Sequence, residues 1–176
     1  MMRKMKICIY AAASDRIDQK YVRAVENLGE QLAKEGHSLI YGGGATGLMG
    51  AAARGFRRGG GEVIGVVPTF MFEIEPTFND CTQIIETEDM ADRKEIMEDG
   101  CDKFIIVPGG VGTLDEFFQV LTLRDLDRHH KPITLYNIDG YYTKLIEFID
   151  QATEKGFIAQ DVREFLNIVN IDFNEE

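Results

Sequence analysis

The chain has 176 residues, close to the usual size of one domain, so the sequence predicts a single core. Its hydrophobic fraction of 44% and its charged fraction of 28% are near globular averages and exclude a largely disordered chain. Asp and Glu number 30 against 19 Lys and Arg, which gives a formal net charge of -11. Such a surface repels nucleic-acid backbones and anionic lipids, so we expect neither nucleic acid nor a membrane as a partner.

The cysteines favour a reducing compartment. Cys8, Cys81 and Cys101 cannot all pair with one another, and none belongs to a C-x-x-C motif. The basic and apolar residues 3–13 resemble a signal peptide in outline, but the apolar run is short and Ala-x-Ala lies inside it. A first β-strand explains this segment better, and we expect a cytoplasmic protein.

Short apolar runs alternate with helical patterns along the chain. The runs predict strands at Lys6–Ala11, Ser38–Tyr41, Glu62–Val67, Gln83–Glu86, Lys103–Val107, Ile133–Tyr136 and Asn167–Ile171. Several are continuous Ile and Val stretches, which is typical of parallel strands covered on both faces. Apolar residues at helical spacing follow several strands, and the first such helix has Asp18 as its expected N-cap. We therefore expect an α/β fold: one Rossmann-like domain over residues 1–176, with a doubly wound parallel sheet and helices on both faces.

The longest irregular stretch is Pro68–Asp80. It holds five large apolar residues, which are Phe70, Met71, Phe72, Ile74 and Phe78. Loops seldom carry that many, so this segment is expected to cover part of the protein or to meet another subunit.

A first glycine loop follows the second predicted strand. Gly42-x-Gly44-x-x-Gly47 matches the dinucleotide-binding fingerprint, and a helix follows it. That fingerprint also needs an acidic residue where the next strand ends, and this strand ends in Val67-Pro68. NAD binding is therefore disfavoured, and both a tight packing turn and a ligand contact remain open.

A second glycine loop lies in the segment Pro108–Glu116, where a buried strand runs through Gly109, Gly110 and Gly112 into a helix. Bare amides at a helix N-terminus bind anions through their orientation and the helix dipole. An acidic protein can hold a phosphate in this way without a cation. No Lys-Ser/Thr pair follows the glycines, so the loop is not a nucleoside-triphosphate P-loop.

Glu116 has two interpretations. Thr113-x-x-Glu116 has the spacing of a capping box, in which the glutamate only stabilises its helix, and local sequence favours this reading. A carboxylate beside a phosphate cradle is repelled by the ligand, however, and so points to a catalytic use.

Arg93 also has two interpretations. It lies in the predicted first turn of a helix, where the helix dipole disfavours a cation. It could form a surface pair with Glu88 or Asp89, which contributes little stability. Because local rules are most often broken at functional sites, an arginine directed at a ligand is the alternative.

These motifs resemble those of the LOG family, the cytokinin-activating phosphoribohydrolases that are often labelled lysine decarboxylases. The segment Pro108–Glu116 fits the PGGxGTxxE signature, and Gly42–Gly50 matches the glycine loop of the family. Met90-x-x-Arg93-Lys94 matches its arginine motif, and the segment Asn137–Tyr142 matches a further block. The likeness runs from about Met5 to Ile158.

The resemblance implies hydrolysis of the N-glycosidic bond of AMP or N6-modified AMP, by a homodimer without metal or cofactor. Cleavage builds positive charge on the ribose, which a carboxylate beneath it would stabilise, and Glu116 fits that role. Arg93 is the second implied catalytic residue, acting as a hydrogen-bond donor to the nucleotide. The implied substrate and phosphate contacts are Ser14, Gly43, Gly44, Met90, Lys94, Gly109, Gly110, Val111, Gly112 and Thr113.

The sequence departs from the family pattern in three places. Ala11-Ala12-Ala13-Ser14 stands where Cys-Gly-Ser-Ser is usual, Ala91-Asp92 replaces a His-Glu pair, and Leu123 replaces a frequent Trp. These changes leave the preferred base open. A non-catalytic nucleotide or molybdenum-cofactor carrier of the same fold is the alternative function. Lysine decarboxylation ranks last, because no lysine has the sequence context of a pyridoxal phosphate site.

Overall fold

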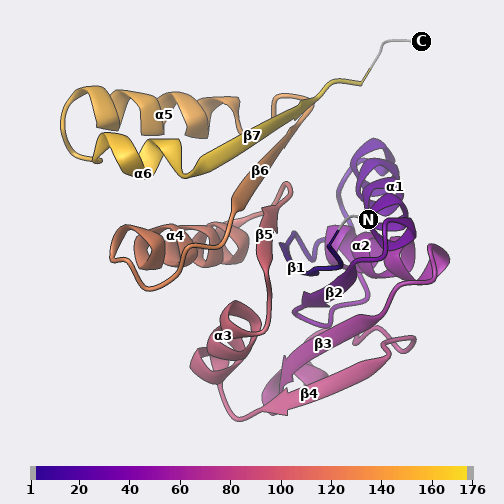
Figure 1. Ribbon diagram of the computed structural model, residues 1–176. Helices are drawn as coiled ribbons and strands as arrows, with labels where there is room; N and C mark the ends of the chain where they lie inside the picture. The colour runs from indigo at the N-terminus through magenta and orange to yellow at the C-terminus, as the bar shows by residue number, and fades with distance from the viewer. Residues whose placement is uncertain (1–2, 174–176) are drawn as a thin grey trace.

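The computed structural model describes residues 3–173, and its seven strands form one parallel sheet (Figure 1). The strand order is β4-β3-β2-β1-β5-β6-β7. The strands are β1 (Lys6–Tyr10), β2 (Ser38–Tyr41), β3 (Val63–Pro68), β4 (Gln83–Thr87), β5 (Lys103–Ile106), β6 (Ile133–Ile138) and β7 (Leu166–Ile171). The predicted α/β architecture is confirmed, and the ends of the predicted strands shift by at most two residues.

Helices cover both faces of the sheet (Figure 1). They are α1 (Gln19–Lys34), α2 (Gly47–Arg58), α3 (Met90–Asp99), α4 (Val111–Asp125), α5 (Thr143–Glu154) and α6 (Gln160–Glu164). Side chains alternate along β1, so that Ile7 and Ile9 pack with α1 and α2, whereas Cys8 and Tyr10 pack with α3 and α4. Each strand therefore contributes to two apolar layers, which explains the absence of polar alternation in the sequence.

Helices α1 and α2 pack closely through small residues. Asp18 caps α1 as predicted, because its carboxylate accepts a hydrogen bond from the Lys20 amide. A Cβ at Gly55 of α2 would lie 2.1 Å from the Glu26 carbonyl oxygen of α1. Glycine at this position therefore lets the two helix backbones approach.

The sheet order reverses between β1 and β5. The chain adds β2, β3 and β4 on one side of β1 and then returns to place β5 on the other side. Connections after β1 and β5 lead to opposite faces of the sheet, and in such folds the ligand crevice lies outside the carboxyl ends of these strands. The segments 11–14 and 107–113 follow these ends.

The segment Pro68–Asp80 contains a short 3-10 helix, η1 (Thr69–Glu73). Phe78 packs against the core on the α1 and α2 face, and its amide donates to the Gly43 carbonyl at 2.8 Å. Phe70, Phe72 and Ile74 remain exposed. One end of the segment thus covers the first glycine loop, and the other presents apolar side chains to the surface.

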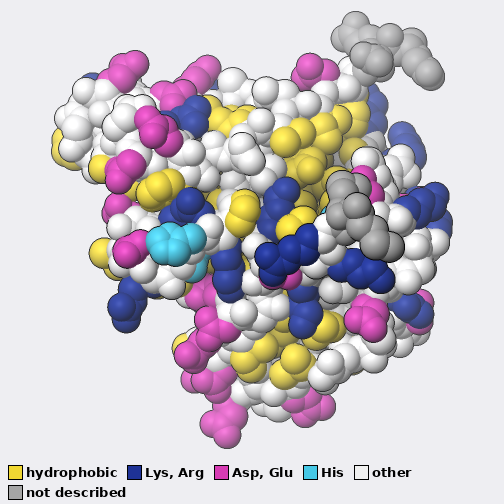
Figure 2. All heavy atoms as spheres, in the orientation of Figure 1, with side chains coloured by type: hydrophobic (Ala, Val, Ile, Leu, Met, Phe, Trp, Pro, Cys, Tyr) yellow, Lys and Arg dark blue, Asp and Glu magenta, His cyan; other side chains and the backbone are white. Residues whose placement is uncertain are grey.

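Acidic side chains gather at one edge of the molecule, over β4 and α3 (Figure 2). They line an open groove and include Glu86, Glu88, Asp92, Glu95 and Asp99. No helix in the described residues 3–173 has the length and apolar character needed to cross a membrane.

Candidate active site

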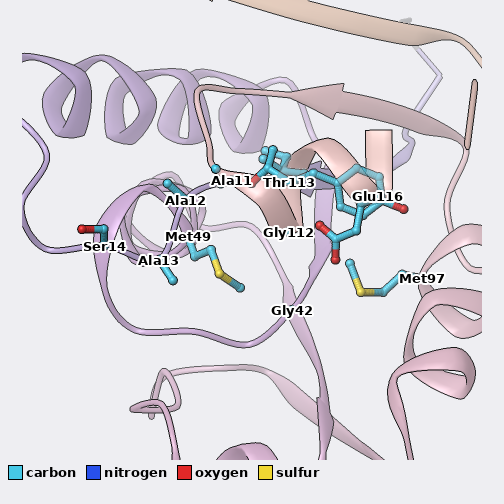
Figure 3. Close-up of a pocket in the computed structure, with 13 residues that line it drawn as sticks. Ala11, Ala12, Ala13, Ser14, Gly42, Met49, Met97, Gly112, Thr113 and Glu116 are labelled. Atoms are coloured by element: carbon cyan, nitrogen blue, oxygen red, sulfur yellow. The ribbon is translucent and has the colours of Figure 1, made fainter. Parts of the chain in front are cut away.

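A cavity of about 280 Å³ opens at the crevice between β1 and β5 (Figure 3). One wall is the segment 11–14 after β1, and another is the start of α4 with Gly110, Gly112 and Thr113. Gly42, at the end of β2, completes the lining together with side chains from α2, α3 and α4. The second glycine loop and Glu116 thus face one space, as the sequence motif predicts.

The N-terminus of α4 has unbonded amides at the cavity. The helix begins at Val111 with Gly110 as N-cap, and no side chain in the described part of the chain caps it. The first helical bond runs from the Leu114 amide to the Gly110 carbonyl at 3.0 Å. The amides of residues 111–113 therefore have no helical acceptor, and together with the helix dipole they have the geometry that suits an anion.

Two glycines of this loop leave open space that the rest of the protein does not fill. A Cβ added at Gly110 or Gly112 would meet no other atom within 4 Å. At Gly109, by contrast, it would lie 2.1 Å from the Thr113 hydroxyl. Internal packing therefore explains the glycine at 109, whereas glycine at 110 and 112 keeps the approach to the amides open.

Glu116 lies about one turn further along α4, and its carboxylate points into the cavity between Met49 and Met97 (Figure 3). Burial raises the pKa of this carboxyl from 4.5 to about 7, although the nearby positive charges of Arg93 and Lys94 act to lower it. The capping-box interpretation is wrong, because α4 starts two residues before Thr113. Glu116 is instead a partly buried carboxyl whose proton is exchangeable near neutral pH.

Arg93 is buried, and its guanidinium holds two strand ends together. Nε donates to the Val66 carbonyl at 3.1 Å, and Nη2 donates to the Gly42 carbonyl at 2.8 Å. The surface pair with Glu88 or Asp89 is therefore wrong, and no carboxylate of residues 3–173 lies within ion-pair distance of Arg93. Its guanidinium lies behind the cavity wall that Gly42 provides, and its positive charge acts on the Glu116 carboxyl.

Two predicted contacts lie on α3, outside the cavity lining. Lys94 forms an ion pair with Asp115 and donates to the Gln119 side chain at 3.0 Å. Met90 is exposed, and its sulfur accepts a long contact of 3.6 Å from Arg93 Nη1. Lys94 thus lies near Glu116, and Met90 lies beside Arg93. Direct contact of either residue with a ligand stays a prediction.

Ser14, Gly43 and Gly44 are predicted ligand contacts, and of these only Ser14 lines the main cavity. Ser14 lines the cavity, but its hydroxyl points away from Glu116 and accepts from the Arg16 amide at 3.2 Å (Figure 3). Gly43 and Gly44 lie beyond Gly42 and form a small cleft with the segment 75–77. Contact of these residues with a ligand likewise stays a prediction.

Sequence reasoning missed the two methionines that flank Glu116, Met49 and Met97. Apolar residues at helical spacing are usually core, and both satisfy that pattern. One signal was available for Met97: it lies four residues after Arg93, on the same face of α3.

A second recess, of about 210 Å³, adjoins the cavity and shares Ala12, Ser14 and Gly110 with it. Tyr141 forms part of its wall, and the Tyr141 hydroxyl donates to the Gly109 carbonyl at 2.7 Å. The adjacent Tyr142 hydroxyl donates to the Val107 carbonyl at 2.8 Å. Two consecutive tyrosines thus hold the β5–α4 loop, with Tyr142 packed in the core layer of α4 and Tyr141 against Tyr21 of α1.

Comparison with known proteins identifies close relatives of the chain. Residues 49–175 match the family model described as "Possible lysine decarboxylase". A probable cytokinin riboside 5′-monophosphate phosphoribohydrolase of Oryza sativa subsp. japonica is 39% identical over 164 residues, which are 93% of this chain and 67% of that protein. A cytokinin riboside 5′-monophosphate phosphoribohydrolase of Arabidopsis thaliana is 39% identical over 161 residues, which are 92% of this chain and 75% of that protein.

Solved structures share the fold at lower sequence identity. The molybdenum cofactor carrier protein of Chlamydomonas reinhardtii superposes with a TM-score of 0.71 at 22% identity, over 95% of this chain and 90% of that one. The molybdenum cofactor binding protein of Rippkaea orientalis gives 0.70 at 24% identity, over 96% and 91%. At these identities the likeness supports the fold alone.

Proposed function

This chain belongs to the family of cytokinin riboside 5′-monophosphate phosphoribohydrolases, and we propose that it hydrolyses the N-glycosidic bond of adenosine-type nucleoside 5′-monophosphates. One observation carries the proposal: the open amides of α4 and the Glu116 carboxylate face the same cavity. The amides offer a site for the 5′-phosphate, and the carboxylate offers a group for the reacting ribose.

Helix geometry sets the spacing between these two groups. Gly112 and Glu116 are four residues apart on α4, which corresponds to a rise of about 6 Å along the axis. A phosphate bound at the first turn therefore places the attached ribose beside the second turn. Fixing the sugar in this way turns the attack of water into a reaction within the bound complex.

The proposed reaction breaks the bond between ribose C1′ and the base nitrogen. The bonding electrons leave with the base, and positive charge develops on the ribose ring. The Glu116 carboxylate stabilises that charge and accepts a proton from the water whose oxygen bonds to C1′. The departing base takes up a proton from solvent, so that the products are the free base and ribose 5-phosphate. Burial raises the pKa of Glu116 to about 7, which suits a group that exchanges protons near neutrality.

Arg93 is proposed to assist departure of the base. Nε and one hydrogen of Nη2 are bonded to backbone carbonyls, and Nη1, now 3.6 Å from the Met90 sulfur, offers donors for a ligand. A thioether is a weak acceptor, so a nucleotide could replace it. Arginine donates hydrogen bonds without giving up its proton, so its role is electrostatic.

The assembly and location of the protein are further proposals. We propose a homodimer, supported by the exposed apolar side chains Phe70, Phe72 and Ile74. A molar mass of one chain, measured by light scattering, would contradict this proposal. We propose a single nucleotide-binding domain over residues 1–176, because all seven strands of the described part join one sheet. Free thiols at Cys8, Cys81 and Cys101 support a cytoplasmic location.

The decisive experiment incubates the purified protein with AMP and with isopentenyl-AMP and measures the free base by chromatography. We expect release of base by the wild type, and for Glu116→Gln a loss of turnover of about 10³-fold with nucleotide binding retained. Asp125→Asn is the control, because this carboxylate of the same helix is exposed and lies outside the cavity lining.

Full activity in Glu116→Gln would remove the catalytic claim. Ligand retained through purification, with no base released from either nucleotide, would instead favour the carrier function. A decarboxylase finds no support at this site, because none of the lysines in residues 3–173 lines the cavity.

A further inference from the structure

The segment Asn137–Tyr142 has no role in the chemistry described above, but its tyrosines contact the loop that joins β5 to α4. The Asn137 side-chain oxygen accepts from the Tyr142 amide at 2.7 Å and so holds the turn after β6 closed. Asp139 and Gly140 adopt left-handed conformations, with φ of 50° and 67°. This turn places the rings of Tyr141 and Tyr142 side by side, with centroids 4.9 Å apart, against the loop that joins β5 to α4.

The two tyrosine hydroxyls bind chemically different peptides. Tyr142 holds the Val107 carbonyl, and the next residue is Pro108, which has no amide hydrogen. Tyr141 holds the Gly109 carbonyl, and the next amide is that of Gly110, the N-cap of α4. In a trans peptide the carbonyl and the following N–H point in opposite directions. Fixing the Gly109 carbonyl therefore directs the Gly110 amide away from Tyr141.

Within residues 3–173, the Tyr141 hydroxyl is the only side-chain group that hydrogen-bonds the Gly109–Gly110 peptide. Glycines flank it on both sides, and glycine visits most backbone conformations at little cost. A Cβ at Gly110 would meet no atom within 4 Å, and the hydrogen bond of this residue to the helix runs through its own carbonyl, which accepts from the Leu114 amide at 3.0 Å. The Tyr141 hydroxyl is thus the group that selects one orientation of the Gly109–Gly110 peptide.

We propose that Tyr141 is a positioning residue for the 5′-phosphate, because it locks the Gly109–Gly110 peptide with the Gly110 amide facing the anion site. This inference rests on the proposed phosphate site of the nucleotide hydrolase. On this proposal, the Tyr141 hydroxyl increases the affinity for phosphate, whereas the Tyr142 hydroxyl stabilises the end of β5. The two residues differ in this way although they are adjacent and make similar hydrogen bonds.

The test compares Tyr141→Phe with Tyr142→Phe and Tyr21→Phe, all in a Glu116→Gln background that does not turn over. Titration calorimetry measures affinity for AMP, inorganic phosphate and adenosine. We expect Tyr141→Phe to weaken the affinity for AMP and for phosphate by about three- to tenfold, the value of one hydrogen bond, and to leave the affinity for adenosine unchanged.

Tyr21→Phe keeps its edge-on contact with the Tyr141 ring and serves as the control for packing. We expect Tyr142→Phe to lower Tm by a few degrees without a selective loss of phosphate affinity, because its hydroxyl is buried.

In the catalytic background, Tyr141→Phe raises KM for AMP and leaves kcat near the wild-type value. Unchanged affinity for AMP and phosphate would overturn the proposal, and so would an equal loss for AMP and adenosine. Failure of the wild type to release base would contradict the hydrolase function. The calorimetric comparison would still decide whether Tyr141 positions a phosphate site, so the two failures are distinguishable.

Discussion

The two glycine loops of this chain look alike in sequence and differ in what their glycines do. In the loop after β2, a Cβ at Gly42 would lie 1.9 Å from Arg93 Nη2, and one at Gly43 would lie 2.3 Å from Val67 Cγ2. In the loop after β5, Gly110 and Gly112 have no such neighbours. The first loop needs glycine for the protein's own contacts, whereas in the second only Gly109 does, and Gly110 and Gly112 keep space for something outside the chain. An unfilled glycine that also lines a cavity is therefore the better marker of a ligand site, since Gly60 and Gly156 are equally unfilled but lie at exposed turns.

Substitution by alanine gives the largest expected contrast between the loops. Gly43→Ala forces a side chain into a backbone with φ of 82° and into Val67, so we expect a loss of about 2–4 kcal/mol in the free energy of unfolding. Gly112→Ala, the matched control inside a helix, should leave stability equal or slightly higher. Urea unfolding of both variants measures this. Equal destabilisation by the two substitutions would contradict the distinction between the loops.

Glu116, in the cavity, lowers the free energy of unfolding by an amount that depends on pH. Burial raises the pKa of Glu116 from 4.5 to about 7, so the folded chain binds this proton more tightly than the unfolded chain does. The free energy of unfolding consequently falls as pH rises between these two values and stays low above them. We expect Glu116→Gln to be more stable than the wild type by on the order of 2–3 kcal/mol above about pH 8, and equally stable near about pH 4.

Chemical unfolding of both proteins at the two pH values checks this expectation. A stability difference that is the same at both pH values would show that the Glu116 carboxyl is not perturbed by its surroundings.

Much of the fold was predictable because its signals are local. Continuous apolar runs such as the one in the predicted strand Lys103–Val107 marked buried parallel strands, and Asp18 marked the start of α1. The open amides at the start of α4 were predictable as well, because the glycines and the helix start that expose them are consecutive in the chain.

The hydrogen-bond partners of individual side chains were not predictable, because they lie on segments that are distant in the sequence. Arg93 reaches carbonyls 27 and 51 residues away, and no local rule distinguishes this from a surface pair. The capping-box reading of Glu116 failed for a local reason, since α4 begins at Val111 with a glycine as its cap. Tyr141 finds its partner Gly109 across 32 residues, because β5 and β6 are neighbours in the sheet.

The most direct test of the account titrates AMP into ¹⁵N-labelled Glu116→Gln protein and follows the backbone amides by NMR. We predict saturable downfield shifts at Gly110, Val111, Gly112 and Thr113, because these amides would donate hydrogen bonds to the phosphate. Smaller shifts at Gly43 and Gly44 would show whether the first loop also contacts the nucleotide. Shifts confined to the first loop, with the amides at the start of α4 unmoved at saturation, would contradict the claim that this helix N-terminus binds the phosphate beside Glu116.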